Sequence, residues 1–238
     1  MKFTAIVLAG GSGSRMQSGT PKQLMSVLGR PLLYYSLAAF EKSPVTNIVL
    51  VAPAGEEGTY LSEFRGYGIS KIVCAAAGGA ERCDSVYSAL QAIRENHIPS
   101  DFVLIHDGAR ACVTQEIISD MMAAAETYGA AVAAVPTKDT VKIADSEGLV
   151  GETPDRSIVW NVQTPQAFAT DLVCAAFDAM YEKTDGSSPR GITDDSMVVE
   201  RYGGTKVKLV EAAYTNIKVT TPEDLPLCEG ILRQQGWT

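Results

Sequence analysis

Short apolar runs alternate along this chain with longer stretches in which apolar residues recur at helical spacing. The apolar runs, which are rich in Val, Ile and Ala, predict strands at residues 3–9, 47–52, 71–76, 101–105 and 131–135. The longer stretches predict helices at residues 32–41, 81–95 and 115–128. This alternation favours an α/β fold with a mostly parallel sheet and helices on both faces, because nearly continuous apolar strands need burial from both sides.

The alternation breaks at Pro136 and leaves a polar segment at residues 138–157. Within it, polar and apolar residues alternate at 140–143, ahead of the turn signal DSEG at 145–148. The segment is either a hairpin that projects from the body of the protein or a surface loop without a role. Further along we expect a Gly/Ser-rich loop at 186–191, a strand at 206–210, and helices at 172–182, at 194–202 and after Pro222.

Length, composition and charge narrow the function classes. The 238 residues, of which 46% are hydrophobic and 20% charged, suit a globular protein with a sizeable core, and we expect a single domain over residues 1–238. The formal charge of −8 argues against sequence-independent binding of nucleic acid, which needs a basic surface. It does not argue against polyphosphate binding, because a few cations gathered in one cleft make a locally positive site.

Cysteine and histidine usage also excludes several classes. The five cysteines are odd in number and form no C-x-x-C pair, which speaks against a disulfide framework and a zinc site. His97 and His106 are the only histidines, too few for a His-rich metal site. The apolar run at 3–9 fits a buried strand better than a signal peptide, and no later run reaches the roughly 18 residues of a membrane span. We therefore expect a cytoplasmic protein without a membrane partner.

The strongest chemical signal is a glycine-rich loop directly after the first strand. Residues 8–16 read LAGGSGSRM, and PKQ follows at 21–23. Glycines let the backbone approach a ligand, and consecutive N–H groups in such a turn bind anions at the carboxyl end of a strand. Arg15 and Lys22 would then place two positive charges beside a triphosphate. The alternative is a glycine-rich surface turn with two solvated cations.

Two other glycine-loop motifs do not fit. A Walker loop ends in Gly-Lys-Ser/Thr, whereas this chain has Gly13-Ser14-Arg15. A dinucleotide fingerprint needs a third glycine where this chain has Met16, which disfavours a nicotinamide-dependent oxidoreductase.

Together with further motifs, this loop resembles the nucleotidyltransferase fold family, and within it the 2-C-methyl-D-erythritol 4-phosphate cytidylyltransferases. The further motifs occur in the order expected of that family: GGAERCDSV at 78–86, HDGAR at 106–110, DTVK at 139–142, DR at 155–156, QTPQ at 163–166, ITD at 192–194 and NIKVT at 216–220. The resemblance covers nearly the whole chain and implies a single Rossmann-like domain with a projecting β-arm. The chain departs from the family at Ala80, Ala111 and Asp195, where aspartate, proline and glutamate are common.

The resemblance assigns roles to individual residues. The expected catalytic residues are four cations: Arg15, Lys22, Arg156 and Lys218. The expected nucleotide-binding residues lie at or shortly after the ends of three predicted strands: Ala9, Gly10, Gly11, Gly13, Gly79, Ala80, Ser85 and Asp107. The expected substrate-binding residues are Arg110, Thr140, Thr164 and Thr193.

Some of these residues have open alternatives when they are read by themselves. Asp107 follows a predicted strand, so it could hold a ribose hydroxyl, a substrate hydroxyl or Mg²⁺, or serve as a turn or helix-capping aspartate. Arg156 or Lys218 alone would more often be a solvated surface cation. His106 fits a packed strand-end residue better than a general base, because attack by an ionised phosphate needs none.

The implied reaction joins CTP to 2-C-methyl-D-erythritol 4-phosphate, a small polyol phosphate, and releases pyrophosphate. Mg²⁺ would bridge the triphosphate oxygens with few direct protein ligands. The resemblance also implies a homodimer in which the arm at 138–157 embraces a second subunit, so that Thr140 and Arg156 act in the partner's site. The alternatives are a ribitol 5-phosphate cytidylyltransferase and a nucleotide-binding regulatory module without catalysis.

Overall fold

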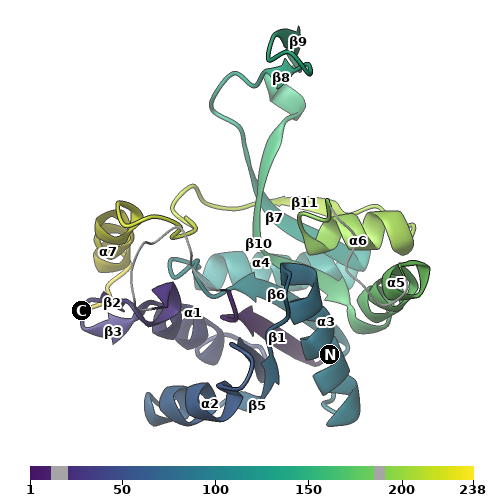
Figure 1. Ribbon diagram of the computed structural model, residues 1–238. Helices are drawn as coiled ribbons and strands as arrows, with labels where there is room; N and C mark the ends of the chain where they lie inside the picture. Colours follow the sequence, from purple (N-terminus) through teal and green to yellow (C-terminus); the bar gives the residue numbers. More distant parts are fainter. Residues whose placement is uncertain (12–20, 185–190) are drawn as a thin grey trace.

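A computed structural model describes residues 1–11, 21–184 and 191–238 of the chain. Within these residues, seven strands form one sheet whose centre is occupied by β6 and β1 (Figure 1). In spatial order the strands are β11 (Lys208–Glu211), β7 (Ala130–Pro136), β10 (Trp160–Ala169), β6 (Phe102–Asp107), β1 (Phe3–Leu8), β4 (Asn47–Ala52) and β5 (Ile72–Ala77). All neighbouring pairs are parallel except those of β10, which runs antiparallel to both β6 and β7.

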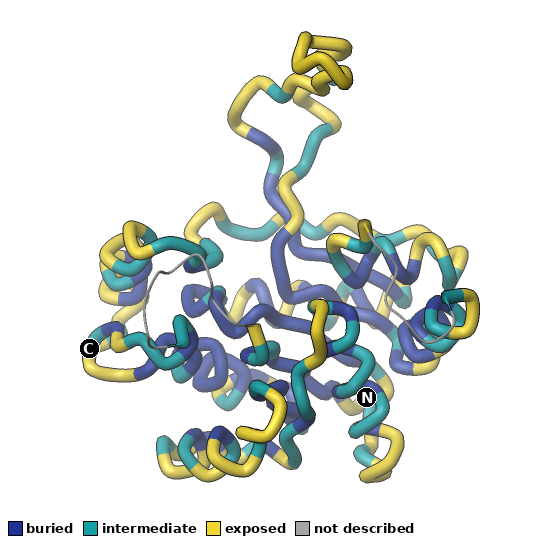
Figure 2. Tube along the Cα trace, in the orientation of Figure 1, coloured by how far each residue is buried: buried dark blue, intermediate teal, exposed yellow. Residues whose placement is uncertain are grey.

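Helices cover both faces of this sheet and bury the strands between them. One face carries α1 (Leu32–Glu41), α2 (Glu57–Gly66) and α4 (Gln115–Tyr128), and the other carries α3 (Arg82–Glu95), α5 (Thr170–Lys183) and α6 (Asp195–Tyr202). Successive side chains of β1 alternate between the two cores, with Ala5 and Val7 on the first face and Ile6 on the second. Buried residues accordingly follow the central strands (Figure 2). The predicted α/β class with a mostly parallel sheet is confirmed.

Short local signals set where the helices begin and end. The side chain of Thr114 accepts a hydrogen bond from Ile117 N and starts α4, which Gly129 ends in the left-handed conformation at φ 74°. Asp194 caps α6 in the same way by accepting from Met197 N. The helix α7 (Asp224–Gln234) packs beside α1 in a smaller apolar cluster, which also receives the β2–β3 hairpin (Ser26–Val27 and Arg30–Pro31).

The segment that follows β7 projects from the body of the protein (Figure 1). It carries the short antiparallel pair β8 (Ile143–Ala144) and β9 (Val150–Glu152), then the 3₁₀ turn η3 (Arg156–Ile158), and it returns through β10. Of the two interpretations of residues 138–157, the projecting hairpin is the one that the structure has. Most of its residues are exposed, as Figure 2 shows.

Two elements of the main body lack a clear signal in the sequence. In α2 only Tyr60 and Phe64 are buried, so its apolar stripe is too sparse to indicate a helix. In β10 the polar residues Gln163, Thr164 and Gln166 are buried, and they mask the strand pattern. No helix of the described ranges is long and apolar enough to cross a membrane.

Candidate functional site

The loops after β1 and β5 meet at glycines. A Cβ atom on Gly10 would lie 3.0 Å from the Cα atom of Gly78 and 3.3 Å from the carbonyl oxygen of Ala52, so only glycine allows this approach. The carbonyl oxygen of Gly11 accepts a hydrogen bond from the amide of Gln23 at 3.0 Å, which ties the loop to the 3₁₀ turn η2 (Lys22–Leu24). Gly13 and Arg15 lie outside the described residues.

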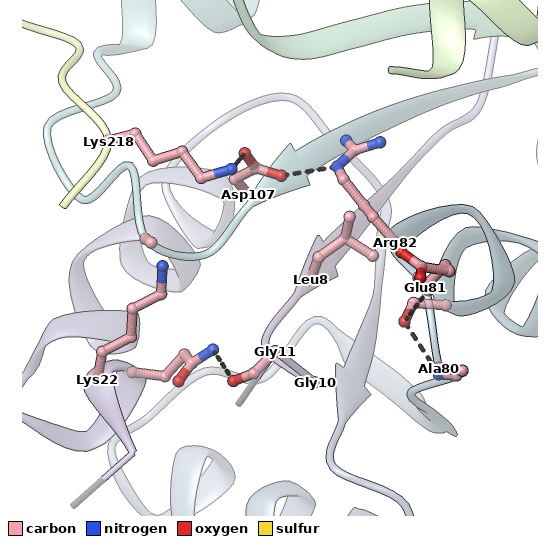
Figure 3. A pocket seen from close by; sticks show the side chains of 13 residues that line it. Leu8, Gly10, Gly11, Lys22, Ala80, Glu81, Arg82, Asp107 and Lys218 are labelled. Atoms are coloured by element: carbon pink, nitrogen blue, oxygen red, sulfur yellow. Dashed lines mark hydrogen bonds and ion pairs between the residues drawn. The ribbon is translucent and has the colours of Figure 1, made fainter. Parts of the chain in front are cut away.

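These loops border a cavity of about 300 Å³ at the carboxyl ends of β1 and β6 (Figure 3). Its lining comes from the glycine loop, η2, the start of α3, the end of β6 and the segment after β11: Leu8, Gly10, Gly11, Lys22, Gln23, Gly79, Ala80, Glu81, Arg82, Ser85, Asp107, Ala109 and Lys218. We call it the first cavity. It contains most of the residues expected to bind the nucleotide. Ala9 is the described exception, because it is buried and its N–H donates to the carbonyl of Val51.

The hydroxyl of Ser85 shapes the first cavity through the backbone. It accepts a hydrogen bond from Gly79 N at 3.0 Å, and it also lies 3.3 Å from the carbonyl oxygen of Glu81. A Cβ atom on Gly79 would collide with the side chain of Asp84, so the Gly-Gly pair at this strand end is required by close packing. Ser85 therefore positions the backbone around Gly79 and Ala80.

Lys22 extends its side chain into the first cavity from η2 (Figure 3). Its Nζ atom donates to the carbonyl oxygen of Val219 at 3.3 Å, next to Lys218 in the chain. The two lysines are separated by almost the whole sequence, but both line the first cavity.

A second cavity of about 620 Å³ adjoins the first and shares Arg82, Asp107 and Lys218 with it. Its other lining residues come mainly from β10, α6 and β11: Arg110, Val132, Val162, Gln163, Thr164, Gln166, Thr193, Asp194, Ser196, Met197, Glu200, Val207 and Leu209. Three of the expected substrate-binding residues, Arg110, Thr164 and Thr193, are therefore brought together here.

Arg82, Asp107 and Lys218, which line both cavities, form the wall that the cavities share. Ion pairs hold this shared wall together. Lys218 Nζ lies 2.7 Å from Asp107 Oδ2, and Arg82 Nε lies 3.1 Å from Asp107 Oδ1. On its other side, Arg82 Nη1 lies 2.8 Å from Oδ1 of the buried Asp195. Burial by itself would raise the pKa of Asp107, but the positive charges of Arg82 and Lys218 outweigh it and hold that pKa far below its usual range. Asp107 is thus a carboxylate at all ordinary pH values.

His106 and Thr164 support this wall from inside the protein. Thr164 Oγ1 accepts from Asp107 N at 3.0 Å and lies 3.1 Å from His106 Nδ1, while His106 Nε2 lies 3.2 Å from the carbonyl oxygen of Arg110. Burial lowers the pKa of His106 to about 4. A fully buried, neutral imidazole with both nitrogens engaged is a packed strand-end residue, which agrees with the interpretation made from the sequence.

Two expected site residues lie on the projecting arm instead. Thr140 and Arg156 are exposed, and neither lines the two cavities of their own chain. Arg156 Nη1 donates to the carbonyl oxygen of Lys138 at 3.1 Å. Of the four expected catalytic cations, Lys22 and Lys218 are therefore together, Arg156 is apart, and Arg15 lies outside the described residues.

Arg82 was not among the predicted site residues, although it lies in the motif at 78–86. The available signal was a cation at the first turn of a helix that follows a Gly-Gly strand end. Such a position faces the same sheet edge as Asp107. Its partner Asp195 appeared in the sequence only as a departure from a family pattern.

Carboxylates are the side chains of this site that could hold a divalent metal ion. No group of three or more His, Cys, Asp or Glu side chains in the described ranges is placed to hold a metal ion. Mg²⁺ commonly takes one or two carboxylates together with substrate phosphates and water. Asp107, which lines both cavities, is the carboxylate that fits this role best.

Comparisons with known proteins agree on one family. The family pattern of 2-C-methyl-D-erythritol 4-phosphate cytidylyltransferase matches residues 3–234. A protein of that name from Lachnospira eligens is 46% identical over 225 residues, which cover 94% of this chain and 96% of that protein. One from Geobacillus thermodenitrificans is 46% identical over 234 residues, with coverage of 98% and 97%.

A solved structure gives the same result for the fold. The crystal structure of 4-diphosphocytidyl-2C-methyl-D-erythritol synthase from Anaerococcus prevotii superposes with a TM-score of 0.82 at 32% identity. The superposition covers 98% of this chain and 96% of that one. The similarity therefore extends over the sheet, the helices and the arm alike.

Proposed function

Because the chain belongs to the 2-C-methyl-D-erythritol 4-phosphate cytidylyltransferase family, we propose that its two adjoining cavities hold CTP and 2-C-methyl-D-erythritol 4-phosphate side by side. The enzyme forms 4-diphosphocytidyl-2-C-methyl-D-erythritol and pyrophosphate, a step in the synthesis of isoprenoid precursors. CTP occupies the first cavity, beside the glycine loop. The polyol phosphate occupies the second cavity, beside Arg110, Thr164 and Thr193.

The observation that carries this proposal is the wall shared by the two cavities. Arg82, Asp107 and Lys218 line both, so two ligands would meet across a few side chains that carry two positive charges and one negative charge. Bringing two phosphate-bearing molecules together is the main obstacle to the reaction, and fixed cations lower it.

The chemistry is an in-line displacement at phosphorus. An oxygen of the polyol phosphate attacks the α-phosphorus of CTP, a new P–O bond forms, and the bond to the β-phosphate oxygen breaks to release pyrophosphate. The nucleophile is already ionised, so no general base is required. The protein supplies position and charge: Lys22 and Arg15 stabilise the α-phosphate, and Lys218 orients the attacking phosphate.

Mg²⁺ is the expected cofactor and supplies charge neutralisation on the triphosphate when it is bound. Asp107 is the carboxylate that would hold it from the protein side. Asp107 is also paired with Arg82 and Lys218. The same carboxylate would therefore contact both the metal ion on CTP and Lys218, the cation proposed to orient the polyol phosphate.

The arm supports the proposal of a homodimer. Its exposed residues include several large apolar side chains, which a single chain leaves facing solvent: Ile143, Leu149, Val150 and Ile158. Arg156 and Thr140 are carried on the same arm, away from their own cavities. A second copy of the chain that covers the apolar residues would receive Arg156 and Thr140 at its polyol-phosphate cavity.

We also propose a cytoplasmic location. All five cysteines are free thiols in the described structure, including Cys112 and Cys228, whose sulfur atoms lie 3.6 Å apart without a bond. Unbonded neighbouring thiols are typical of a reducing compartment.

A pyrophosphate-release assay tests the function. The purified enzyme with Mg²⁺ is given each of the four common nucleoside triphosphates, once with 2-C-methyl-D-erythritol 4-phosphate and once with ribitol 5-phosphate. We expect release with CTP and the methylerythritol substrate and little with the other pairs. Faster turnover of ribitol 5-phosphate would reassign the substrate, and absence of release with every pair would reject the proposed catalysis.

A further inference from the structure

Arg82 connects three elements at the shared wall. It is the first residue of α3, Asp107 is the last of β6, and Asp195 is the first of α6. The Nε atom of its guanidinium contacts Asp107 and the Nη1 atom contacts Asp195, at 3.1 and 2.8 Å. A planar guanidinium that binds two carboxylates through different nitrogens fixes their relative orientation more rigidly than a rotatable ammonium group does.

The carboxylate of Asp195, on the far side of Arg82, is buried at the start of a capped helix. The side chain of Asp195 is 1% exposed, whereas that of Arg82 is 28% exposed toward the cavities. Asp195 starts a helix that Asp194 caps, and its main chain is therefore fixed by α6. Arg82 is thus anchored through Nη1 by the buried carboxylate of Asp195, and its Nε atom contacts Asp107 at the cavities.

Lys218 and Arg82 both form ion pairs with the carboxylate of Asp107. Each cation contacts a different oxygen of the same carboxylate. To orient the phosphate of the polyol substrate, Lys218 has to give up part of its contact with Asp107. The second cation on Asp107 lowers the cost of that exchange, because the carboxylate keeps a partner when Lys218 turns to a phosphate.

We propose that Arg82, anchored by Asp195, is a positioning residue that fixes Asp107 in the wall between the cavities and thereby frees Lys218 to engage the polyol phosphate. The proposal rests on the proposed function and adds to it an ion-paired unit, Asp195–Arg82–Asp107, behind the reacting groups. Arg82 does not touch the reacting atoms in this role, because its contacts are with the two carboxylates.

A double-mutant cycle between Arg82→Gln and Asp107→Asn tests the proposal. In the wild-type background we expect Arg82→Gln to lower kcat/KM for the polyol phosphate about tenfold or more, since an ion-paired positioning contact is lost. In the Asp107→Asn background the same change should cost less than about threefold, because the residue through which Arg82 acts has lost its charge. Independent effects that multiply would overturn the proposal, as would unchanged kinetics of Arg82→Gln alone.

Two further variants separate positioning from folding. Arg82→Lys keeps the charge but loses the planar fork, and Asp195→Asn loses the anchor. Both should reproduce part of the loss in kcat/KM when rates are divided by the number of CTP-binding sites, and they carry the test if Arg82→Gln does not fold. A purely structural role would lower the melting temperature and leave the rate per site unchanged. Full rescue by Arg82→Lys would exclude the bridging role.

Arg94→Gln is the matched control. Arg94 belongs to the same helix and pairs with Asp178 at 2.6 Å, but it lines neither cavity. Its replacement should leave the rate per site unchanged. Activity of the wild-type enzyme on CTP and the polyol phosphate tests the proposed function separately, so an additive cycle in an active enzyme would reject only the role of Arg82.

Discussion

Under the proposed function, Lys22 and Lys218 are single side chains that supply positive charge beside the substrate phosphates. The protein is acidic, with a formal charge of −8, yet two lysines and Arg82 border the same cavity. Their effect is local, because a low-dielectric wall focuses the field of a few cations on bound phosphate. The net charge therefore says little about which anions the protein binds.

Replacing Lys22 with Ala is the direct test of that charge. We expect kcat to fall by roughly a hundredfold or more, the scale for loss of one preorganised charge-stabilising donor. Steady-state pyrophosphate release measures it. Lys2→Ala, which removes an exposed lysine at the opposite end of β1, is the control and should keep normal turnover. Near-normal turnover of the Lys22 variant would remove Lys22 from catalysis.

His106 makes stability depend on pH. Its pKa falls from 6.5 to about 4 on burial, so the unfolded chain binds more protons between these values. Stability is full above pH 6.5 and is lost as the pH falls toward 4, by about 2 kcal/mol between pH 7.5 and pH 5. Urea unfolding at both pH values measures this loss. Burial raises the pKa of Asp195, which acts in the opposite direction, but that contribution is common to wild type and variant.

The His106→Gln variant isolates the histidine. Its free energy of unfolding should change less between pH 7.5 and pH 5 than that of the wild type, whatever its absolute stability. His97→Asn removes an exposed histidine at φ 50°, a conformation that asparagine tolerates, and should keep the wild-type pH dependence. An identical pH dependence in the wild type and His106→Gln would contradict the assignment.

Among the elements, the arm is the one whose residues serve another copy of the chain under the proposed dimer. β8 and β9 form a small sheet with little buried surface of its own. A pair of strands this short is not stable in isolation. In the proposed dimer, cover by a partner subunit would account for the apolar residues that the arm exposes.

Val150→Asp tests this explanation at the tip of β9. Val150 is 62% exposed in the single chain, and a carboxylate there should weaken the dimer, which sedimentation velocity would detect as a shift toward the monomer mass. The matched control is Leu227→Asp in α7, which is 55% exposed but away from the arm. A Val150 variant that sediments like the wild type would argue against an arm-mediated interface.

At the scale of the whole molecule, the proposed active site is divided between two subunits. Within one chain the cavities contain Lys22 and Lys218, and the arm carries Arg156 away from them. The assembly rather than the folded chain would then be the catalytic unit.

Mixed dimers distinguish a site shared between subunits from a site within one chain. Lys22→Ala and Arg156→Ala should each be nearly inactive as pure dimers, the second mainly through a raised KM for the polyol phosphate. After unfolding and refolding together, random pairing should restore about a quarter of wild-type activity, because one site of each mixed dimer keeps both residues. Mixtures that stay inactive, although mass spectrometry detects mixed dimers, would place Arg156 in its own chain's site.

Local patterns in the sequence were sufficient for most of the architecture. The runs at 47–52, 32–41 and 115–128 coincide with β4, α1 and α4. The first two are nearly continuous buried apolar segments, and the third has buried residues on one face and a capping residue at each end. The glycine-rich loop after the first strand could also be predicted from the sequence. The structure gives the reason for two of the glycines, because the close approach of Gly10 and Gly78 leaves no room for a side chain. By contrast, α2 and β10 went unrecognised, because sparse burial in one and buried polar residues in the other hide the period.

The sequence by itself determined the fold class and the glycine-rich loop that follows the first strand, because each depends on neighbours in the chain. Only the tertiary structure decided which charges meet. Arg82, Asp107, Asp195 and Lys218 come from four separate segments, and their ion pairs exist because the carboxyl end of β6 lies beside the starts of α3 and α6. Electrostatic contacts act over a few ångströms in space, and sequence separation gives no measure of that distance.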